Sequence, residues 1–418
     1  MKKLFALLLA ALCSLLFMLC MTGCKKEGGA QGPEPQETLP AAAAVPASGR
    51  ALVSAGDGEF ALTASGIYEA QIIFDGFANL MYTDIAGQKR DFLCSDPACS
   101  HNSEACSSYI PTPGAVFPPL VLTAGDRLLV FITDRLEQGG PTLLSMNFDG
   151  TGREELLTLP EHQHIRGDFF TDGAQLYFDT IEFKPDGSTY LQLCRLDLET
   201  KKFETVCPLS NSTEACALAG ALGSELLFCK AAGGRLEYYR ADADAPSFDQ
   251  PFFVDTSTTG SSLLMDGWLF SLDEAAQTVT RMNLATNETA TVKLTVPDGY
   301  FGLAMRYLFD GNLLAEVIGP LVDGEYDFCA WFLNFDKGSC TEMTLRTPYN
   351  DEPVYVMADV GDLVYVSTDY RLYKPVGLAQ GDETDYYYGA NVYAFMTKQD
   401  YEASNAAGYR MVEDAFAG

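Results

Sequence analysis

Two columns of residues recur along the chain at nearly the same interval, and this repetition limits the folds that the sequence can adopt. In the first column a glycine or aspartate opens an apolar run, marked by Leu128, Leu176, Leu226, Trp268, Leu313 and Leu363. In the second an acidic or amide residue ends the next strand and opens a turn, at Asp84, Asp149, Asp197, Asp242, Asn283 and Asp336. A period of about 40–50 residues with several strands per unit is typical of a β-propeller, in which four-stranded sheets surround a central channel.

The stretch 171–207 shows the repeating unit most clearly. Gln175 to Asp179 and Tyr190 to Leu196 alternate apolar and polar residues, and a third strand ends at Val206, with turns between the three. We therefore predict an all-β fold, a β-propeller of seven blades with four antiparallel strands each. The expected blades lie near Gly58–Tyr109, 117–160, 163–210, 213–254, 257–297, 298–347 and 352–415.

Two further expectations concern how the blades are built. Glu59 to Thr63 (EFALT) could supply a strand to the last blade and close the ring, which would remove exposed sheet edges. The Asp and Asn residues of the second column stand where the third strand turns into the fourth. Their side chains can accept hydrogen bonds from backbone amides there, so we interpret this column as structural rather than catalytic.

The first 23 residues have the organisation of a targeting segment. Lys2 and Lys3 precede the apolar run Leu4 to Met21, and Met21-Thr22-Gly23-Cys24 places small residues before a cysteine. That arrangement resembles the lipobox of bacterial lipoproteins, with Met in place of the commoner Leu. The resemblance implies cleavage after residue 23, acylation of Cys24, and a lipid anchor on the extracellular face of the bacterial cytoplasmic membrane. An ordinary signal peptide and a single membrane span are the alternatives.

Residues 24–50 are expected to form a flexible tether between Cys24 and a propeller domain at 51–418. They are rich in Gly, Pro, Ala and Gln and show no apolar periodicity. After residues 1–23 are removed, 57 acidic residues face 25 basic ones. So acidic a chain is not expected to bind nucleic acid, because neutralising phosphates requires a basic surface.

The insert after Cys94 carries the densest group of potential ligands, with Cys94, Cys99, His101 and Cys106 in the spacing C-x4-C-x-H-x4-C. We expect the fourth strand of the first blade to end at Cys94 and the extra residues to follow it. A Cys₃His set can close a tetrahedron around a structural Zn²⁺. A disulfide with one spare thiol, or three thiols, are the alternatives, and an oxidising exterior favours disulfides.

Together, the lipobox, the tether and the insert CSDPACSHNSEAC resemble Gram-positive surface lipoproteins that carry a propeller domain. More loosely, the repeats are similar to TolB-like and YVTN-type propellers. This resemblance implies a fold and a location, and it implies no particular activity.

Motifs of the catalytic propellers are missing from the sequence. The chain has two tryptophans, whereas the quinoprotein propellers that it could be compared with carry repeated ones, and it has neither sialidase boxes nor WD signatures. His162 and His164 could share a metal, but a solvated loop between blades is the favoured interpretation. We therefore expect a non-catalytic binding module for a glycan, a peptide or a partner protein. The alternative is a carbohydrate-active hydrolase or lyase with paired carboxylates at the channel.

Three consecutive tyrosines, Tyr386, Tyr387 and Tyr388, interrupt the last repeat within an acidic stretch. Strand alternation would bury some of them in the core, which is the favoured interpretation. On a loop they could instead bind a ligand, because tyrosine offers a large contact area at a small entropic cost.

Overall fold

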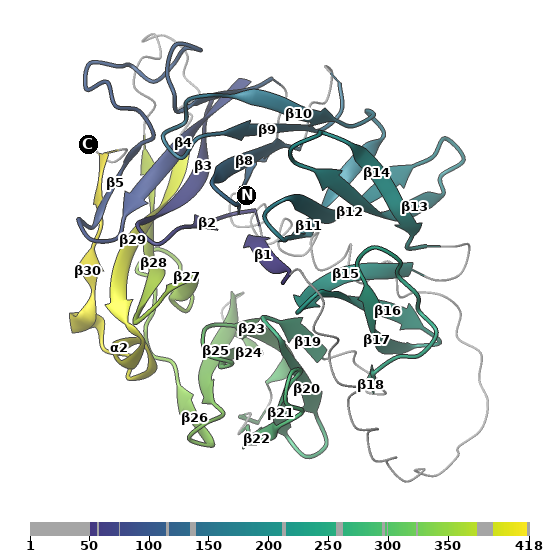
Figure 1. Ribbon diagram of the computed structural model, residues 1–418. Coiled ribbons are helices and arrows are strands. Elements are labelled where there is room, and N and C mark those ends of the chain that lie inside the picture. The colour runs from purple at the N-terminus through teal and green to yellow at the C-terminus, as the bar shows by residue number, and fades with distance from the viewer. Residues whose placement is uncertain are drawn as a thin grey trace.

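The computed structural model is a ring of seven antiparallel sheets (Figure 1). It describes residues 51–56, 58–74, 76–113, 117–133, 139–210, 215–255, 262–294, 297–298, 300–322, 325–373 and 388–415. Within these ranges the chain is all-β apart from the short helix α2 (Lys398–Glu402) and the 3₁₀ turn η1 (Ala406–Gly408). No helix in the described ranges is long and apolar enough to cross a bilayer. The predicted propeller with seven four-stranded blades is confirmed.

The blades follow one another along the chain, each running from its innermost to its outermost strand. Blade 1 is built on β2 (Ala61–Leu62), β3 (Gly66–Phe74), β4 (Gly76–Asp84) and β5 (Lys89–Phe92). Blade 2 contains β7 (Leu120–Ala124), β8 (Arg127–Ile132), β9 (Thr142–Met146) and β10 (Glu154–Thr158). Blade 3 contains β11 (Gln163–Thr171), β12 (Gln175–Phe183), β13 (Thr189–Asp197) and β14 (Phe203–Pro208).

The second half of the ring repeats this pattern. Blade 4 contains β15 (Ala215–Leu222), β16 (Glu225–Ala232), β17 (Arg235–Asp242) and β18 (Phe253–Asp255). Blade 5 contains β19 (Ser262–Met265), β20 (Trp268–Asp273), β21 (Thr278–Asn283) and β22 (Thr289–Lys293). Blade 6 contains β23 (Phe301–Tyr307), β24 (Leu313–Val322), β25 (Glu325–Asn334) and β26 (Ser339–Glu342). Blade 7 contains β27 (Tyr355–Val360), β28 (Leu363–Tyr373), β29 (Tyr388–Thr397) and β30 (Arg410–Met411).

Because each blade is antiparallel, its turns define two faces of the ring. We name the bottom face by the turns that join the first strand to the second and the third to the fourth, such as 223–224 in blade 4. The top face carries the hairpins between second and third strands, such as 184–188 in blade 3, and the connections from one blade to the next. Loops on a rigid scaffold of this kind commonly carry binding sites.

Both sequence columns have structural roles. The first column lies in the second strand of blades 2 to 7, where Leu128, Leu176, Leu226 and Leu313 are fully buried. In the second column, Asp84 accepts hydrogen bonds from the Ala86 and Gly87 amides, and Asp149, Asp197, Asp242 and Asn283 accept equivalent bonds in their own turns. The sixth assignment was wrong, because Asn334 caps the blade 6 turn at Lys337, while Asp336 pairs with Arg281 at 2.6 Å.

The blades pack on one another through aromatic and aliphatic side chains instead of repeated tryptophans. Between blades 2 and 3, Phe131, Phe169 and Phe178 are fully buried in one cluster, with Phe131 5.5 Å from each of the other two rings. Burial of such rings supplies much of the free energy that holds neighbouring blades together.

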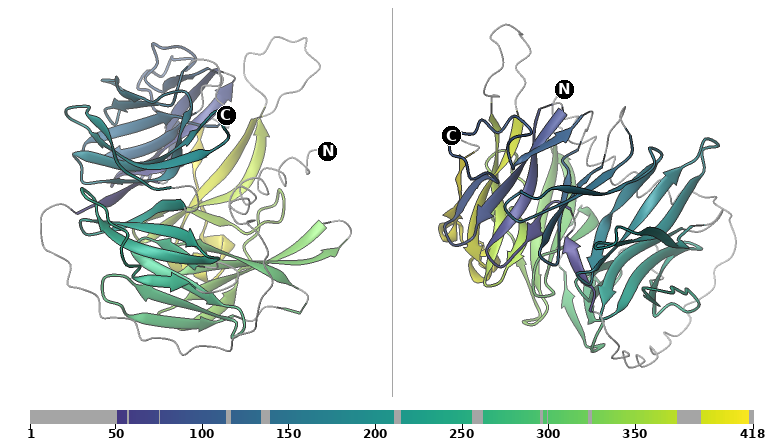
Figure 2. Two further views of the ribbon diagram at one scale, coloured as in Figure 1. Left: turned by 90° about the vertical axis from the view of Figure 1, so that its right-hand side faces the viewer. Right: turned by 45° about the horizontal axis from the view of Figure 1, so that its top comes forward.

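The ring closes differently from the prediction. Glu59 to Thr63 does not add a strand to blade 7; instead, β2 in this stretch is the innermost strand of blade 1 itself. Closure comes from the C-terminus, where β31 (Glu413–Asp414) pairs in parallel with β5 on the outer edge of blade 1. Blades 7 and 1 therefore lie side by side, as both views of Figure 2 show. Sequence reasoning missed this pairing because β31 has only two residues, too few for alternating apolar and polar residues to reveal a strand.

A buried ion network reinforces this closure. The Arg90 side chain, on β5, is fully buried and donates to Glu69 of β3 at 2.7 Å and to both carboxylate oxygens of Asp414 at 3.1 Å. The Tyr393 hydroxyl, on β29 of blade 7, also donates to Glu69, at 3.2 Å. One guanidinium thus connects the first blade, the last blade and the C-terminal strand.

The N-terminal segment lies inside the ring. Strand β1 (Val53–Gly56) adds to the inner edge of blade 3, antiparallel to β11, with Val53 opposite Thr171 and Gly56 opposite Phe169. It also contacts β7 and β15, and Figure 1 shows it near the centre of the ring. Sequence reasoning missed this strand, which lies between the predicted end of the tether at residue 50 and the predicted start of the first blade near Gly58.

Candidate metal centre and top-face pocket

The cysteine insert interrupts the outer strand of blade 1 instead of following it. Strand β5 pairs with the second half of β4, and β6 (Tyr109–Thr112) pairs with the first half. Between them, the Leu80 carbonyl accepts from the Leu93 amide at 2.9 Å, and the Leu80 amide donates to the Ser108 carbonyl at 2.8 Å. Residues 94–107 are therefore an excursion whose two ends meet at one residue of β4, which corrects the predicted end of the strand at Cys94.

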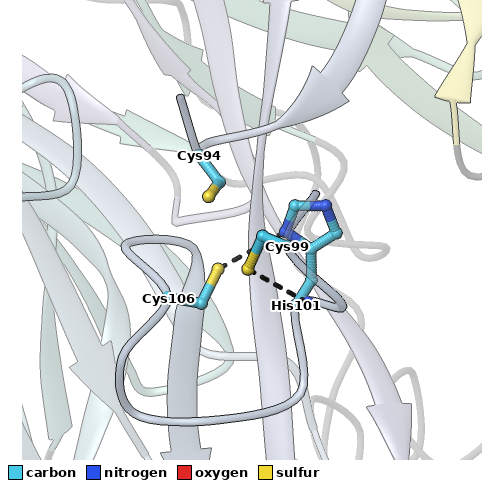
Figure 3. A group of neighbouring side chains, drawn as sticks. All are labelled: Cys94, Cys99, His101 and Cys106. Atoms are coloured by element: carbon cyan, nitrogen blue, oxygen red, sulfur yellow. Dashed lines mark hydrogen bonds between the residues drawn. The ribbon is translucent and has the colours of Figure 1, made fainter. Parts of the chain in front are cut away.

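The four predicted ligands come together at the base of this excursion (Figure 3). The Sγ atoms of Cys94, Cys99 and Cys106 and a ring nitrogen of His101 all lie within 4.8 Å of one another. The His101 Nδ1 atom is 3.4 Å from Cys106 Sγ. Around a tetrahedral Zn²⁺ with bonds of about 2.0–2.3 Å, ligand atoms would be roughly 3.5–3.8 Å apart. Cys94, Cys99 and Cys106 are all thiols here, with no disulfide among them.

Local interactions hold the ligands in these positions. The imidazole of His101 stacks on the Phe92 ring at 4.1 Å between centroids, and the backbone of His101 has a φ of 54°, which non-glycine residues rarely adopt. The His101 amide donates to Cys99 Sγ at 3.4 Å. Near Cys106, the Ser108 amide donates to Sγ at 3.4 Å, while the Ser108 hydroxyl donates to Asn79 at 2.9 Å. Such outer contacts typically orient the ligands of a metal ion.

Proton affinity differs between Cys99 and Cys106. Burial alone would raise the pKa of Cys106, but hydrogen bonds from Ser108 and His101 outweigh it and lower the pKa to about 6. For Cys99, the hydrogen bond from the His101 amide favours the thiolate, yet burial and the neighbouring thiols together raise its pKa to about 11. The surroundings thus favour the thiolate at Cys106 and the thiol at Cys99, and a bound cation would favour the deprotonated form of Cys99.

Blade 2 fixes the second end of the excursion. The Arg153 guanidinium donates to the backbone carbonyls of Ser107 and Tyr109. Gly150 lies against the Ser107 carbonyl so closely that an added Cβ would come within 2.5 Å of it, and its φ of 78° also favours glycine. Both contacts place the Cys94–Cys106 group at the boundary between blades 1 and 2.

A second candidate site is a pocket of about 640 Å³ at the top face of the ring. Its walls come from the N-terminal segment and from blades 1, 2, 3 and 7. The lining residues are Gly58, Glu59, Phe60, Glu69, Ala70, Gln71, Phe117, Pro118, Pro119, Leu120, Thr133, His164, Ile165, Gly167, Met357, Tyr370, Ala390, Asn391 and Tyr393. A mostly apolar wall with a few polar groups is usual for small-molecule sites. Among the described residues that line the pocket, none is Lys or Arg, and two are glutamates.

Exposed aromatic side chains gather on the same face. Phe117, Phe183, Phe328, Tyr349 and Tyr370 are between 37% and 55% exposed, and each lies at a top-face loop or at the top end of its strand. Tyr349 and Tyr370 contact each other, with ring centroids 5.2 Å apart, and Tyr370 also lines the pocket. The other large apolar side chains exposed in the described ranges, Val53, Leu62, Met265 and Met411, are all aliphatic.

The predicted histidine and tyrosine sites have different outcomes. His162 is 3.3 Å from Glu182, and His164 packs edge-on against Phe183 and lines the pocket. Neither belongs to the Cys94–Cys106 group, which alone among the described residues places three or more Cys, His, Asp or Glu side chains to share an ion. Tyr386 and Tyr387 lie outside the described residues. Tyr388 begins β29, in the hairpin whose lower part supplies Tyr370 and Asn391 to the pocket.

Comparisons with known proteins found only distant structural similarity. No protein-family model matches the sequence, and no curated protein matches it. A prolyl endopeptidase structure has 11% identity and a TM-score of 0.46, over 83% of this chain and 47% of that one. This chain therefore spans less than half of that protein. TolB from Acinetobacter baumannii has 13% identity and a TM-score of 0.32, over 82% and 78% of the two chains. Oligogalacturonate lyase from Vibrio parahaemolyticus has 12% identity and a TM-score of 0.33, over 87% and 79%.

A buried carboxyl in blade 3 should make the stability of the ring depend on pH. Burial raises the pKa of Asp179 to about 6, although Arg166 lies 3.6 Å away and lowers it. The folded state therefore favours the protonated form. This contribution to stability is complete below pH about 4 and is lost as the pH rises through about 6.

We expect Asp179→Asn to stabilise the protein at about pH 7 by on the order of 1–3 kcal/mol, since it removes the cost of burying the charge. Urea unfolding at several pH values would measure the effect. The two proteins should converge in stability below pH about 4. A variant less stable than the wild type at neutral pH would mean that the Arg166 pair outweighs the burial of the carboxylate.

Proposed function

We propose that this protein is a non-catalytic recognition module, anchored by a lipid on Cys24 to the extracellular face of the bacterial cytoplasmic membrane. The observation that carries the proposal is the top-face pocket, with Phe117 and Tyr370 in its wall and further exposed aromatic rings on the same face. Aromatic side chains offer large, rigid contact surfaces to sugar rings and to peptide side chains. The ligand is therefore a glycan, a peptide or a segment of a partner protein. The 57 acidic and 25 basic residues of the chain without residues 1–23 argue against nucleic acid as a partner.

The second candidate function is a carbohydrate-active hydrolase or lyase, which would need two carboxyl groups about 5–10 Å apart and ready to exchange protons. The pocket lining contains two, Glu59 and Glu69. Glu69 is buried, and its carboxylate accepts one hydrogen bond from the Arg90 guanidinium at 2.7 Å and another from the Tyr393 hydroxyl. A carboxylate held in this way serves the packing of blades 1 and 7, which favours binding over catalysis.

A screen on glycan and peptide arrays tests this function when the same ligands are also assayed for cleavage. We expect binding to at least one class of ligand without any product, detected by mass spectrometry of the recovered ligand. Turnover of a bound oligosaccharide would contradict the recognition module and support the second candidate.

The insert adds a separate proposal, that Cys94, Cys99, His101 and Cys106 hold a structural Zn²⁺. Three sulfur atoms and one imidazole nitrogen suit zinc, and four protein ligands leave no position for a substrate. The ion would join the two ends of the 94–107 excursion to β4, and so hold the outer strand of blade 1 in register.

A further inference from the structure

The path of the N-terminal segment determines which face of the ring lies nearer to the predicted tether. The Leu52 amide donates to the Gly223 carbonyl at 2.7 Å, and Gly223 lies in the turn between β15 and β16 on the bottom face. Val53 is opposite Thr171, the last residue of β11, which also ends at the bottom face. The described chain therefore begins at the bottom of the ring.

From there the segment rises through the ring toward the top face. Gly56 is opposite Phe169, and the Gly58 carbonyl accepts from the Val121 amide at 2.8 Å, near the top end of β7. Gly58, Glu59 and Phe60 then form part of the pocket wall. The chain turns back only at β2, which descends to the Thr63–Gly66 turn. The connection to the tether and the pocket thus lie on opposite faces.

The short length of the predicted tether favours the same orientation of the ring when the protein is anchored. Residues 24–50 would span roughly 25–30 Å as a flexible chain. A nine-residue strand such as β11 is itself about 30 Å long, so the two faces are separated by a similar distance. To turn the top face toward the bilayer, the tether would have to stretch around the outside of the ring, at a cost in chain entropy.

The two faces differ in chemistry, and the direction itself comes from the position of the tether connection. The five aromatic side chains that are exposed in the described ranges all lie on the top face. The bottom face carries the acidic turn residues Asp84, Asp149, Asp197 and Asp242, which an anionic bilayer would repel. The bottom face is therefore expected to remain separated from the lipid surface and not to bind it.

We infer that the anchored protein holds its bottom face toward the membrane and presents the top-face pocket outward, so that its ligand comes from the aqueous or cell-wall side. This inference rests on the lipid anchor of the proposed function. It excludes lipids and integral proteins of the same membrane surface as occupants of the pocket.

Fluorescence energy transfer to a labelled lipid would test the orientation. The full-length lipidated protein would be reconstituted into phosphatidylcholine vesicles whose outer leaflet contains a rhodamine lipid. A donor dye would be attached through an azide-bearing residue placed at Met265 on the bottom face or at Phe183 on the top face, which are 41% and 49% exposed. We expect severalfold stronger transfer from the bottom position, because transfer falls steeply over a separation of about 30 Å.

Equal transfer from the two positions, or stronger transfer from Phe183, would overturn the inferred orientation. A Cys24→Ser protein serves as the control and should remain unbound to the vesicles. If the wild type also fails to bind the vesicles, the anchor itself is wrong and the orientation falls with it. The two failures are therefore distinguishable.

Discussion

Replacing Arg90 by alanine should destabilise the protein by about 3–5 kcal/mol, because it leaves buried carboxylates without their cation. Arg90 is fully buried between Glu69 and Asp414 and connects the C-terminal strand to blade 1. Its loss weakens the ring at the joint between the first and the last blade, where no covalent link exists. Chemical unfolding followed by tryptophan fluorescence would measure the change, since Trp268 and Trp331 lie in blades 5 and 6.

The neighbouring residue on the same strand offers a matched control. Lys89 pairs with Asp91 at 2.7 Å, but both side chains are nearly half exposed, and such pairs contribute little to stability. Lys89→Ala should therefore leave the unfolding midpoint nearly unchanged. If Arg90→Ala behaved like Lys89→Ala, the C-terminal strand would not be what closes the ring.

Replacing Cys99 by serine should abolish metal binding by the insert. The wild-type protein, purified without chelators, is expected to carry about one zinc ion per chain, and Cys99→Ser close to none, because a structural site needs its four ligands. Elemental analysis gives the stoichiometry. Limited proteolysis gives a second measurement, in which loss of the ion should expose residues 94–107 to cleavage.

Cys207→Ser is a suitable control, since Cys207 lies in β14 of blade 3, away from the insert. It should retain zinc and the wild-type pattern of proteolysis. A folded wild type without metal, in which the 94–107 excursion resists proteases, would remove the zinc proposal and leave the thiols with another role.

The sequence was sufficient to predict the repeated strands because each blade carries its own local signals. Leu176 opens a buried strand, and Asp197 opens the turn that follows the next one, within a single unit. The four metal-ligand candidates were also recognisable, since their spacing is short enough to be read as one motif. These local features are the reason that the seven blades and the Cys94–Cys106 group could be predicted.

Other features depend on contacts that are distant in sequence. The pairing of β31 with β5 joins residues more than three hundred positions apart. Nothing in the sequence of either segment indicates that the two pair. Cys94 did not end the outer strand of blade 1, because the Leu80 carbonyl accepts from Leu93 before the excursion and the Leu80 amide donates to Ser108 after it. The pocket was missed for the same reason, as Phe117, His164 and Tyr370 come from three blades. The predicted ligand-binding role of Tyr386, Tyr387 and Tyr388 stays a prediction, since Tyr386 and Tyr387 lie outside the described residues.

The most direct test of the account is to measure where the ligand binds. The strongest array ligand would be titrated by calorimetry into the wild type, into a variant carrying Phe117→Ala and Tyr370→Ala, and into the bottom-face control Met265→Ala. We predict that the double variant binds at least about tenfold more weakly, because truncated aromatic contacts typically cost more than about 1.4 kcal/mol in total. The control should bind like the wild type. Wild-type affinity in the double variant would contradict the assignment of the top-face pocket as the recognition site.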